Sequence, residues 1–297
     1  MLKKKELLGG ILLVMICAGI WAESMSNGIF QYLVGEYQIY TLVESEREGD
    51  TSILYHNDDV DFSSFIPETG FKHTANAFLV KAPEMNILID TGTGSQGVLM
   101  EKLATLGIAP TAIHIILLTH LHFDHFGGLA SEGKPNFPHA KVYLAEEEYA
   151  YFVSGESKNQ SAIEILALYG ENVITFKAKE FDNNQENFLV HGENLPQITA
   201  IANHGHTPGH TIYLIENGSE KILIAGDFLH IAPVQFPHPE ISATYDMNPT
   251  AAAESRRQVL DYSAKNKIPI GGMHVGFPGI GIVEVEGEGY IYTQPEN

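Results

Sequence analysis

The sequence predicts an α/β domain in which β-sheets lie between helices. Short apolar runs of the kind that form buried strands recur along the chain, and segments with helical spacing of apolar residues lie among them. Strands mixed with helices favour sheets that are covered by helices. The chain has 297 residues, of which 44% are hydrophobic and 18% are charged, so it can bury a sizeable core and is not expected to be disordered.

The expected elements follow in chain order. Residues 77–80 and 87–89 bracket a Pro-Glu turn and predict a pair of strands. Residues 113–118 are nearly all apolar, as in a strand that is buried on both faces. Further strands are expected at residues 142–144, 198–202, 211–215, 222–225 and 268–270. Apolar residues at helical spacing predict helices at residues 98–106, 163–168 and 250–264.

The N-terminal segment, residues 1–22, predicts a signal peptide for export to the periplasm or the cell exterior. Lys3, Lys4 and Lys5 form a basic start, and the uncharged residues 7–22 are fewer than the ~20 that span a bilayer comfortably. An uncleaved short anchor is the alternative. Cleavage leaves residues 23–297 as a single domain without Cys17, the only cysteine, and so excludes thiolate nucleophiles and cysteine metal ligands.

The charge of the chain limits its partners. There are 37 acidic against 17 basic side chains, and the net charge is −20. A nucleic acid or an anionic lipid surface requires a positive protein surface. We therefore expect neither a nucleic-acid partner nor, after signal cleavage, a membrane partner.

Four groups that can bind a metal lie close together after the apolar run 113–118. They are His120, His122, Asp124 and His125. Neutral imidazole nitrogens and a carboxylate oxygen together suit zinc or another divalent cation. Without a metal, such a cluster would lose solvation and bring protonated rings into mutual repulsion. The spacing therefore predicts a metal centre at the end of this strand.

Other metal-binding side chains follow other apolar runs. His206 and His210 come after residues 198–202, Asp227 comes after residues 222–225, and His274 comes after residues 268–270. In α/β folds the loops at strand ends usually carry the active site. We therefore expect these residues to join the first cluster in one site.

Together with Asp90-Thr91-Gly92, these residues resemble the metallo-β-lactamase superfamily, over nearly all of the chain after residue 70. The closer resemblance is to its methyl parathion hydrolase-like and acyl-homoserine lactonase-like branch, through residues 75–80, 204–210, 234–236 and 277–281. The resemblance implies a four-layer αββα sandwich. It also implies two divalent metal ions, with zinc expected, at one edge of that sandwich.

The resemblance further implies a ligand set. The first metal would be held by His120, His122 and His210, and the second by Asp124, His125 and His274, with Asp227 as a bridge between them. In this interpretation His206 competes with His210 but is assigned to the loop beside the metal. Asp90 would orient the site by hydrogen bonding without binding a metal.

The remaining histidines receive simpler interpretations. His230 lies where related lactonases can carry a tyrosine that contacts the substrate, so it is a candidate substrate contact, with mere packing as the alternative. The others lie in turn-like or polar stretches, and we expect them to be exposed. These are His56, His73, His139, His191, His204 and His238.

Two cations joined by Asp227 can share a water molecule and lower its pKa, so that a metal-bound hydroxide attacks a carbonyl or phosphoryl centre. The expected catalytic residues are Asp124, Asp227 and His230. The first hypothesis is an exported lactonase for small neutral esters, with N-acyl-homoserine lactones as substrates and hence quorum quenching. The alternatives are an organophosphate phosphotriesterase and, from another class, a mononuclear-iron persulfide dioxygenase. The resemblance also suggests a homodimer.

Overall fold

The computed structural model describes residues 14–16, 20–25, 27–55, 61–155, 157–181, 189–190 and 196–295. Most of the predicted signal peptide, residues 1–22, lies outside these ranges, so its cleavage stays a prediction. Strands β1 (Val14–Ile16) and β2 (Ile20–Met25) form an antiparallel pair in this segment. In the part of the chain that the structure describes, no helix is long and apolar enough to cross a membrane.

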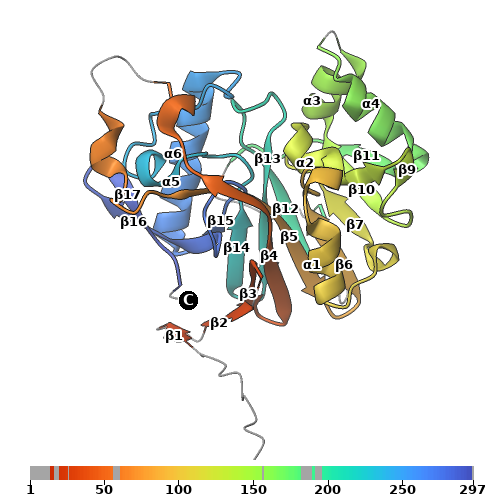
Figure 1. The fold of residues 1–297 in the computed structure, drawn as a ribbon, viewed down its shortest axis with the longest axis horizontal. Helices are drawn as coiled ribbons and strands as arrows, with labels where there is room; N and C mark the ends of the chain where they lie inside the picture. The colour runs from red at the N-terminus through yellow and green to blue at the C-terminus, as the bar shows by residue number, and fades with distance from the viewer. Residues whose placement is uncertain are drawn as a thin grey trace, which may run out of the picture.

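Two large sheets form the centre of the fold (Figure 1). The first sheet has nine described strands in the order β1-β2-β3-β4-β5-β6-β7-β10-β11. Neighbours are antiparallel from β1 to β6 and parallel from β6 to β11. Beyond β1 and β2, the strands are β3 (Ile29–Val34), β4 (Tyr37–Glu48), β5 (Lys72–Ala82), β6 (Met85–Ile89), β7 (Ile115–Leu117), β10 (Lys141–Ala145) and β11 (Val173–Phe176).

The second sheet has six described strands in sequential order, and only the pair β14–β15 is parallel. Its strands are β12 (Gln197–Ala202), β13 (Thr211–Asn217), β14 (Glu220–Ile224), β15 (Ile270–Gly271), β16 (Ile280–Glu286) and β17 (Gly289–Thr293). A separate short ribbon pairs β8 (Ala130–Ser131) with β9 (Lys134–Pro135).

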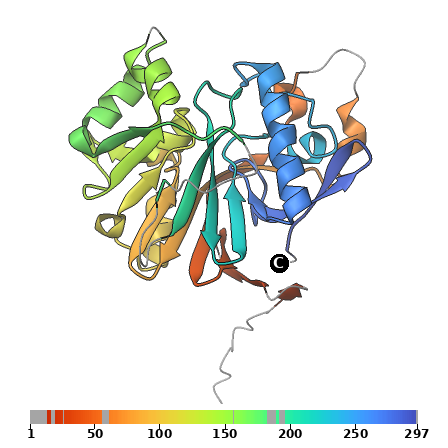
Figure 2. The same cartoon turned by 180° about the vertical axis from the view of Figure 1, so that it is seen from behind.

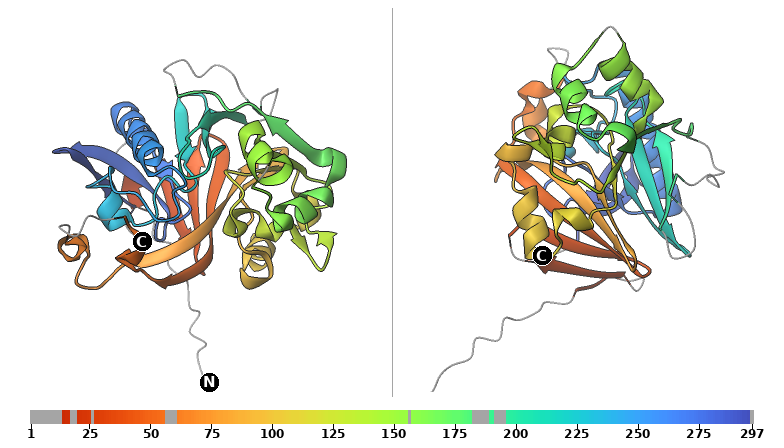
Figure 3. Two further views of the ribbon diagram at one scale, coloured as in Figure 1. Left: turned by 90° about the horizontal axis from the view of Figure 1, so that it is seen from above. Right: turned by 90° about the vertical axis from the view of Figure 1, so that its right-hand side faces the viewer.

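Helices cover the outer faces of both sheets (Figures 2 and 3). Leu103 of α1 and Leu166 of α4 pack with Leu88 of the first sheet, whereas Leu260 of α6 packs with Leu223 of the second sheet. The layers are therefore helix, sheet, sheet and helix, and the predicted four-layer αββα fold is confirmed. The helices are α1 (Leu99–Thr105), α2 (Phe123–Phe126), α3 (Glu146–Tyr149), α4 (Gln160–Ala167), α5 (Ala232–Gln235) and α6 (Pro249–Asn266).

Strand β5 shows why the central strands are apolar on both faces. Ala77 and Leu79 join the core under α1 and α4, whereas Phe78 and Val80 join a second core between the two sheets. Side chains alternate between the faces of a strand, so a strand between two layers needs apolar residues at every position. The continuous apolar runs read from the sequence are the direct consequence of this arrangement.

The longest helix, α6, begins at a strong local signal. The Asn248 side chain accepts a hydrogen bond from the Ala251 backbone N–H at 3.2 Å, and Pro249 occupies the first helical position. The helix ends where Lys267 adopts a left-handed conformation, with φ 54°. The predicted helix at residues 250–264 is therefore confirmed, with its start one residue earlier than expected.

The other predicted elements are largely confirmed, and the differences concern short or charged strands. The strand pair at residues 77–80 and 87–89 is the antiparallel pair β5–β6. The strand expected at residues 268–270 is only the short β15. Nine of the described strands were not predicted, namely β1, β2, β3, β4, β8, β9, β11, β16 and β17.

Candidate metal centre

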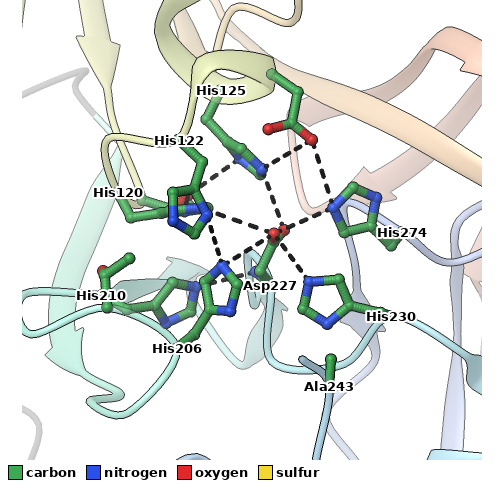
Figure 4. Close-up of polar contacts among 12 residues, drawn as sticks. His120, His122, His125, His206, His210, Asp227, His230, Ala243 and His274 are labelled. Carbon is green, nitrogen blue, oxygen red and sulfur yellow. Dashed lines mark hydrogen bonds and ion pairs between the residues drawn. The ribbon is translucent and has the colours of Figure 1, made fainter. Parts of the chain in front are cut away.

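The predicted site residues meet at one edge of the sandwich because they follow strands that end there. Asp90 comes directly after β6, His120 follows β7, Asp227 follows β14, and His274 follows β15. His122 then begins the short helix α2, which carries Asp124 and His125 on its first turn. Segments far apart in the sequence thus place their polar side chains around a common centre (Figure 4).

Four overlapping groups of metal-binding atoms form there, and two of them have no residue in common. The first cluster is His120, His122 and His206, which are grouped with Asp227, and the second cluster is Asp124, His125 and His274. The other two groups place His230 with His206 and Asp246, and with Asp227 and His274. Within each cluster one nitrogen or oxygen per residue lies within 4.8 Å of the others. The structure thus brings six histidine and aspartate side chains together in two groups of three, as a dinuclear site requires.

Asp227 lies between the two clusters, as Figure 4 shows. Its Oδ2 is 3.7 Å from His120 Nε2 and 3.3 Å from His206 Nε2 in the first cluster. The same carboxylate reaches the second cluster, with Oδ1 at 3.2 Å from His125 Nε2 and Oδ2 at 3.1 Å from His274 Nε2. This position is the one that a bridging carboxylate occupies.

The chemistry of the cluster fits bound cations. His120 Nε2, His125 Nε2 and Asp227 Oδ1 are buried without a hydrogen-bond partner among the described residues. His122 Nδ1 and His206 Nε2 lie 3.0 Å apart, so without a cation one ring donates a proton to the other in a hydrogen bond. Burial lowers the pKa of His206, but its hydrogen bonds to Asp227 and Asp246 outweigh this effect and raise that pKa to about 9. These buried lone pairs and the Asp227 carboxylate are stabilised by positive charge, which bound metal ions would supply.

The ring nitrogens that face away from the centre are held by the protein. His125 Nδ1 is 2.6 Å from Asp90 Oδ2, His274 Nδ1 donates to the Thr74 carbonyl at 2.7 Å, and His206 Nδ1 is 2.9 Å from Asp246 Oδ1. Such outer hydrogen bonds fix the ring orientation and leave the inner nitrogen free to bind a metal. The predicted orienting role of Asp90 agrees with this geometry.

The prediction that His210 binds the first metal stays a prediction, and in the structure this ring makes hydrogen bonds to the backbone. Its Nε2 accepts a hydrogen bond from the Asp227 backbone N–H at 3.0 Å, and its Nδ1 lies 3.0 Å from the Asn203 carbonyl. Both nitrogens are thus engaged by the backbone. A Cβ at Gly226 would lie only 2.5 Å from His210 Nε2, so a glycine lets this ring approach the strand end. His206, which was assigned to the loop, lies among the metal-binding atoms of the first cluster, whereas His210 is in none of the groups that could hold a metal.

A buried ion pair stands behind His206. Asp246 Oδ1 contacts the ring, and Asp246 Oδ2 lies 3.4 Å from the guanidinium of Arg256, which is 1% exposed. Arg256 also donates to the Phe228 carbonyl at 2.6 Å, directly after Asp227. Arg256 of helix α6 therefore supports His206 through Asp246 and supports Asp227 through the adjacent Phe228 carbonyl. No sequence pattern indicated this role for Arg256.

Glu148 joins the two loops that supply the first cluster. It is fully buried, and it accepts hydrogen bonds from the Leu121 N–H at 2.8 Å, the Thr207 hydroxyl at 2.8 Å and the Gly209 N–H at 2.9 Å. Burial raises the pKa of Glu148 to about 7, although these hydrogen bonds oppose the rise. Glu148 is the last of three consecutive glutamates after β10, and nothing in this run distinguished it from the two that precede it.

Two further histidines border the centre. His230 is 2% exposed, its Nε2 lies 3.4 Å from Asp227 Oδ2, and its ring stacks on His274 with centroids 5.0 Å apart. His73 was expected to be exposed but is 8% exposed, with its ring stacked on His274 at 4.7 Å. The prediction for His73 is wrong because β5 places its ring against His274, in the loop that follows β15. His139, His204 and His238 are at least partly exposed, and His56 and His191 lie outside the described residues.

A cavity of about 260 Å³ opens onto this centre. Five of its lining residues come from the clusters or their neighbours, namely His122, Asp124, Asp227, His230 and His274. The rest of the lining is formed by Arg47, His73 and Tyr245. A small molecule that enters the cavity therefore meets the metal-binding atoms directly.

Comparisons with known proteins agree with this geometry. A family model described as the metallo-beta-lactamase superfamily matches residues 71–279. Uncharacterized protein YobT of Bacillus subtilis is 31% identical over 154 residues, which are 51% of this chain and 60% of YobT. A probable metallo-hydrolase of Streptococcus pyogenes is 26% identical over 160 residues, 52% of this chain and 61% of that protein. The chain thus spans about three fifths of these curated relatives.

Solved structures are similar over almost the whole chain. The hydrolase AbOPH, described as in the beta lactamase superfamily, is 28% identical with a TM-score of 0.76 and covers 92% of this chain and 99% of its own. AidC, a dizinc quorum-quenching lactonase in complex with its product, has the same fold with a TM-score of 0.76, at 22% identity and coverage of 91% and 98%. Because the family model matches more than half of the chain, this protein belongs to the metallo-beta-lactamase superfamily.

Proposed function

We propose that this protein is a metal-dependent hydrolase of small neutral esters and that its substrates are lactones of the N-acyl-homoserine type. The observation that carries the proposal is the pair of clusters that share Asp227 beside a cavity of about 260 Å³. Among the described residues that line this cavity, none is a serine, threonine, cysteine or lysine. We therefore propose water as the nucleophile, with the aspartates and histidines of the cavity assigned to holding metal or contacting substrate.

Two divalent ions, with zinc expected, would polarise a carbonyl oxygen at this centre and lower the pKa of a water molecule toward neutrality. The protein's own groups have separate tasks. Asp227 is 2% exposed and holds the two clusters in register. Asp124, whose side chain is 35% exposed, is the carboxylate that can exchange a proton with the substrate.

His230 is proposed as a substrate contact. Its ring lines the cavity, and its Nδ1 is buried without a hydrogen-bond partner among the described residues. Burial lowers the pKa of His230 to about 4, so the ring is neutral near pH 7 and has one N–H to donate. The substrate's carbonyl or leaving oxygen is the acceptor that we assign to it.

The cavity fits a small ester with an acyl chain, and the lactone is our choice within that class. The cavity is small, and the ring of Tyr245, which is 47% exposed, stands at its border and offers an apolar surface to an acyl chain. AidC and another structural neighbour, an N-acyl homoserine lactone hydrolase, hold the product N-hexanoyl-L-homoserine, but their identities of 22% and 19% show the fold alone. The lactone is therefore our proposal for this chain.

Export is part of the same proposal. The basic and apolar character of residues 1–22 supports removal of this segment and a periplasmic or secreted location. The net charge of −20 supports a small-molecule substrate rather than a nucleic acid. Mass spectrometry of the protein from its native host tests the cleavage, and a mass that retains residues 1–22 would contradict it. Sedimentation velocity tests the expected homodimer.

The activity is tested with a panel of kcat/KM values measured on one sample of known metal content. The panel contains an acyl-homoserine lactone, an aryl phosphotriester, a β-lactam and glutathione persulfide. We expect the lactone to be the best substrate and the protein to contain two zinc-like ions per chain. Faster turnover of the phosphotriester would assign the phosphotriesterase function instead, and a single iron with persulfide oxidation would refute hydrolysis.

A further inference from the structure

The cavity beside the metal centre carries a permanent positive charge, Arg47, that the proposed reaction does not use. Among the described residues lining the cavity, Arg47 is the only lysine or arginine. It lies near the end of β4, directly opposite His73 of β5 in the antiparallel register. Residues directly opposite in such a pair share one face of the sheet, so Arg47 stands beside a ring that stacks on His274.

The neighbours of Arg47 along β4 do not neutralise it. Glu46 and Glu48 flank it, and side chains that adjoin along a strand point to opposite faces. Both acidic side chains pair with Lys72. Across this end of β4 and β5, one face thus carries an ion-paired trio, and the other face carries Arg47 toward the cavity.

Arg47 also lacks a carboxylate partner within the described ranges, where no ion pair to it is found. The acidic group that feels its charge is Asp50, whose pKa is lowered chiefly by hydrogen bonds from Ser52 and only slightly by Arg47. On the cavity side, His73 Nε2 is buried and has no hydrogen-bond partner in the described structure. The donors of Arg47 and this nitrogen are the polar atoms left over at this end of the cavity.

We propose that Arg47 binds a carboxylate of the substrate, at a position remote from the ester bond that is cleaved. This inference rests on the proposed lactone hydrolysis but departs from its neutral substrates, because it makes lactones whose acyl chain ends in a carboxylate the preferred members of that class. A guanidinium presents a planar pair of N–H donors that matches a carboxylate. The net charge of the chain is −20, so the surface as a whole repels an anionic substrate. The positive charge of Arg47 would attract such a substrate locally, at the cavity.

The test uses two lactones of equal length that differ in one group. N-hexanoyl-homoserine lactone is neutral, and its analogue with a carboxylate at the end of the same acyl chain is anionic. Wild type is compared with Arg47→Gln and with Lys72→Gln, a matched control that removes one positive charge from the opposite face of the same strands. Binding of adipate to the metal-loaded proteins is measured by calorimetry as a readout that needs no turnover.

In wild type we expect the anionic lactone to have at least a fivefold higher kcat/KM than the neutral one at low salt. Arg47→Gln should raise KM for the anionic lactone about tenfold, equivalent to about 1.4 kcal/mol, and weaken adipate binding similarly. The neutral lactone should change less than twofold, and Lys72→Gln should leave the preference intact. Added salt should reduce the preference, because the pair is partly exposed.

The outcomes separate this inference from the function on which it rests. If both lactones are hydrolysed and Arg47→Gln affects them equally or not at all, the carboxylate site is refuted and the lactonase proposal stands. If neither lactone is hydrolysed but adipate binding depends on Arg47, the lactonase proposal fails and the anion site stands.

Discussion

The two clusters of the metal centre are held in different ways. In the second cluster, His125 and His274 are oriented by groups that lie next to strand ends, the Asp90 carboxylate and the Thr74 carbonyl. In the first cluster, His206 depends on Asp246, which depends in turn on Arg256 of helix α6. One half of the site is therefore built into the central strands, whereas the other half relies on a buried ion pair from a distant helix.

This difference suggests that one cluster can lose its metal affinity while the other keeps it. A ligand whose orienting partner is a neighbouring strand keeps its position as long as the sheets persist. A ligand that is oriented through a chain of side chains can be lost when one link is changed, because breaking a buried charge pair leaves an uncompensated charge. The first cluster is thus expected to be the weaker metal site.

The largest effect is expected from Asp227→Ala, because its carboxylate lies within 3.1 to 3.7 Å of histidines in both clusters. Hydrolysis should fall at least about a thousandfold, and the metal content should drop below two ions per chain. Kinetics and elemental analysis on the same sample check both expectations. Asp227→Ala with full activity would show that the clusters do not act together.

The next largest effect is expected from His206→Ala, and His210→Ala is the variant with which it is compared. His206→Ala should lose one metal ion and most of the activity, since it removes a ligand atom from the first cluster. His210→Ala should keep two ions but lower the free energy of unfolding by about 1–3 kcal/mol, because the buried Asp227 N–H loses its acceptor. Metal content and denaturant unfolding of the two variants are compared. Loss of a metal from His210→Ala alone would restore the interpretation made from the sequence.

Asp246→Asn sharpens the comparison between the clusters. It should weaken binding of one metal ion about 10–100-fold, since a partner that orients a metal-binding histidine contributes about this much. The second ion should retain its affinity, because Asp90 and Thr74 are unchanged. Competition with a chelator measures the two affinities. Equal weakening of both ions would mean that the halves are not independently supported.

The smallest effect is expected from His230→Ala, because His230 is in neither the first nor the second cluster, although its Nε2 lies 3.4 Å from Asp227 Oδ2. It should lower kcat/KM for the preferred substrate about tenfold while leaving the metal content at two ions, since His230 is proposed to contact only the substrate. The same substrate panel used for wild type provides the measurement. Unchanged kcat/KM values on every substrate would show that His230 only packs beside the site and does not contact the substrate.

The central elements could be predicted from the sequence because their constraint is local. Strands such as β5 and β7 are buried on both faces, so every position is apolar and the run is easily recognised. Strand β4 was missed because it ends in Glu46, Arg47 and Glu48, where it passes from the core to the solvent. β16 likewise ends in exposed acidic residues.

The site was predictable where the ligands are close together in sequence. The segment from His120 to His125 supplies four metal-binding side chains within six residues. The sequence could not show which of His206 and His210 faces the first cluster. That depends on which ring accepts the hydrogen bond from the Asp227 backbone N–H, and in the structure it is His210. Asp246, Arg256 and Glu148 act across distances of 10 to 61 residues, and no local pattern marks such partners.

The most direct test of the account is a titration of metal-free protein with zinc, followed by hydrolysis of N-hexanoyl-homoserine lactone at each step. Because the clusters share Asp227, we predict that activity stays low up to one ion per chain and rises to its maximum with the second ion. Full activity at one ion per chain, or in the absence of metal, would contradict a dinuclear hydrolytic centre.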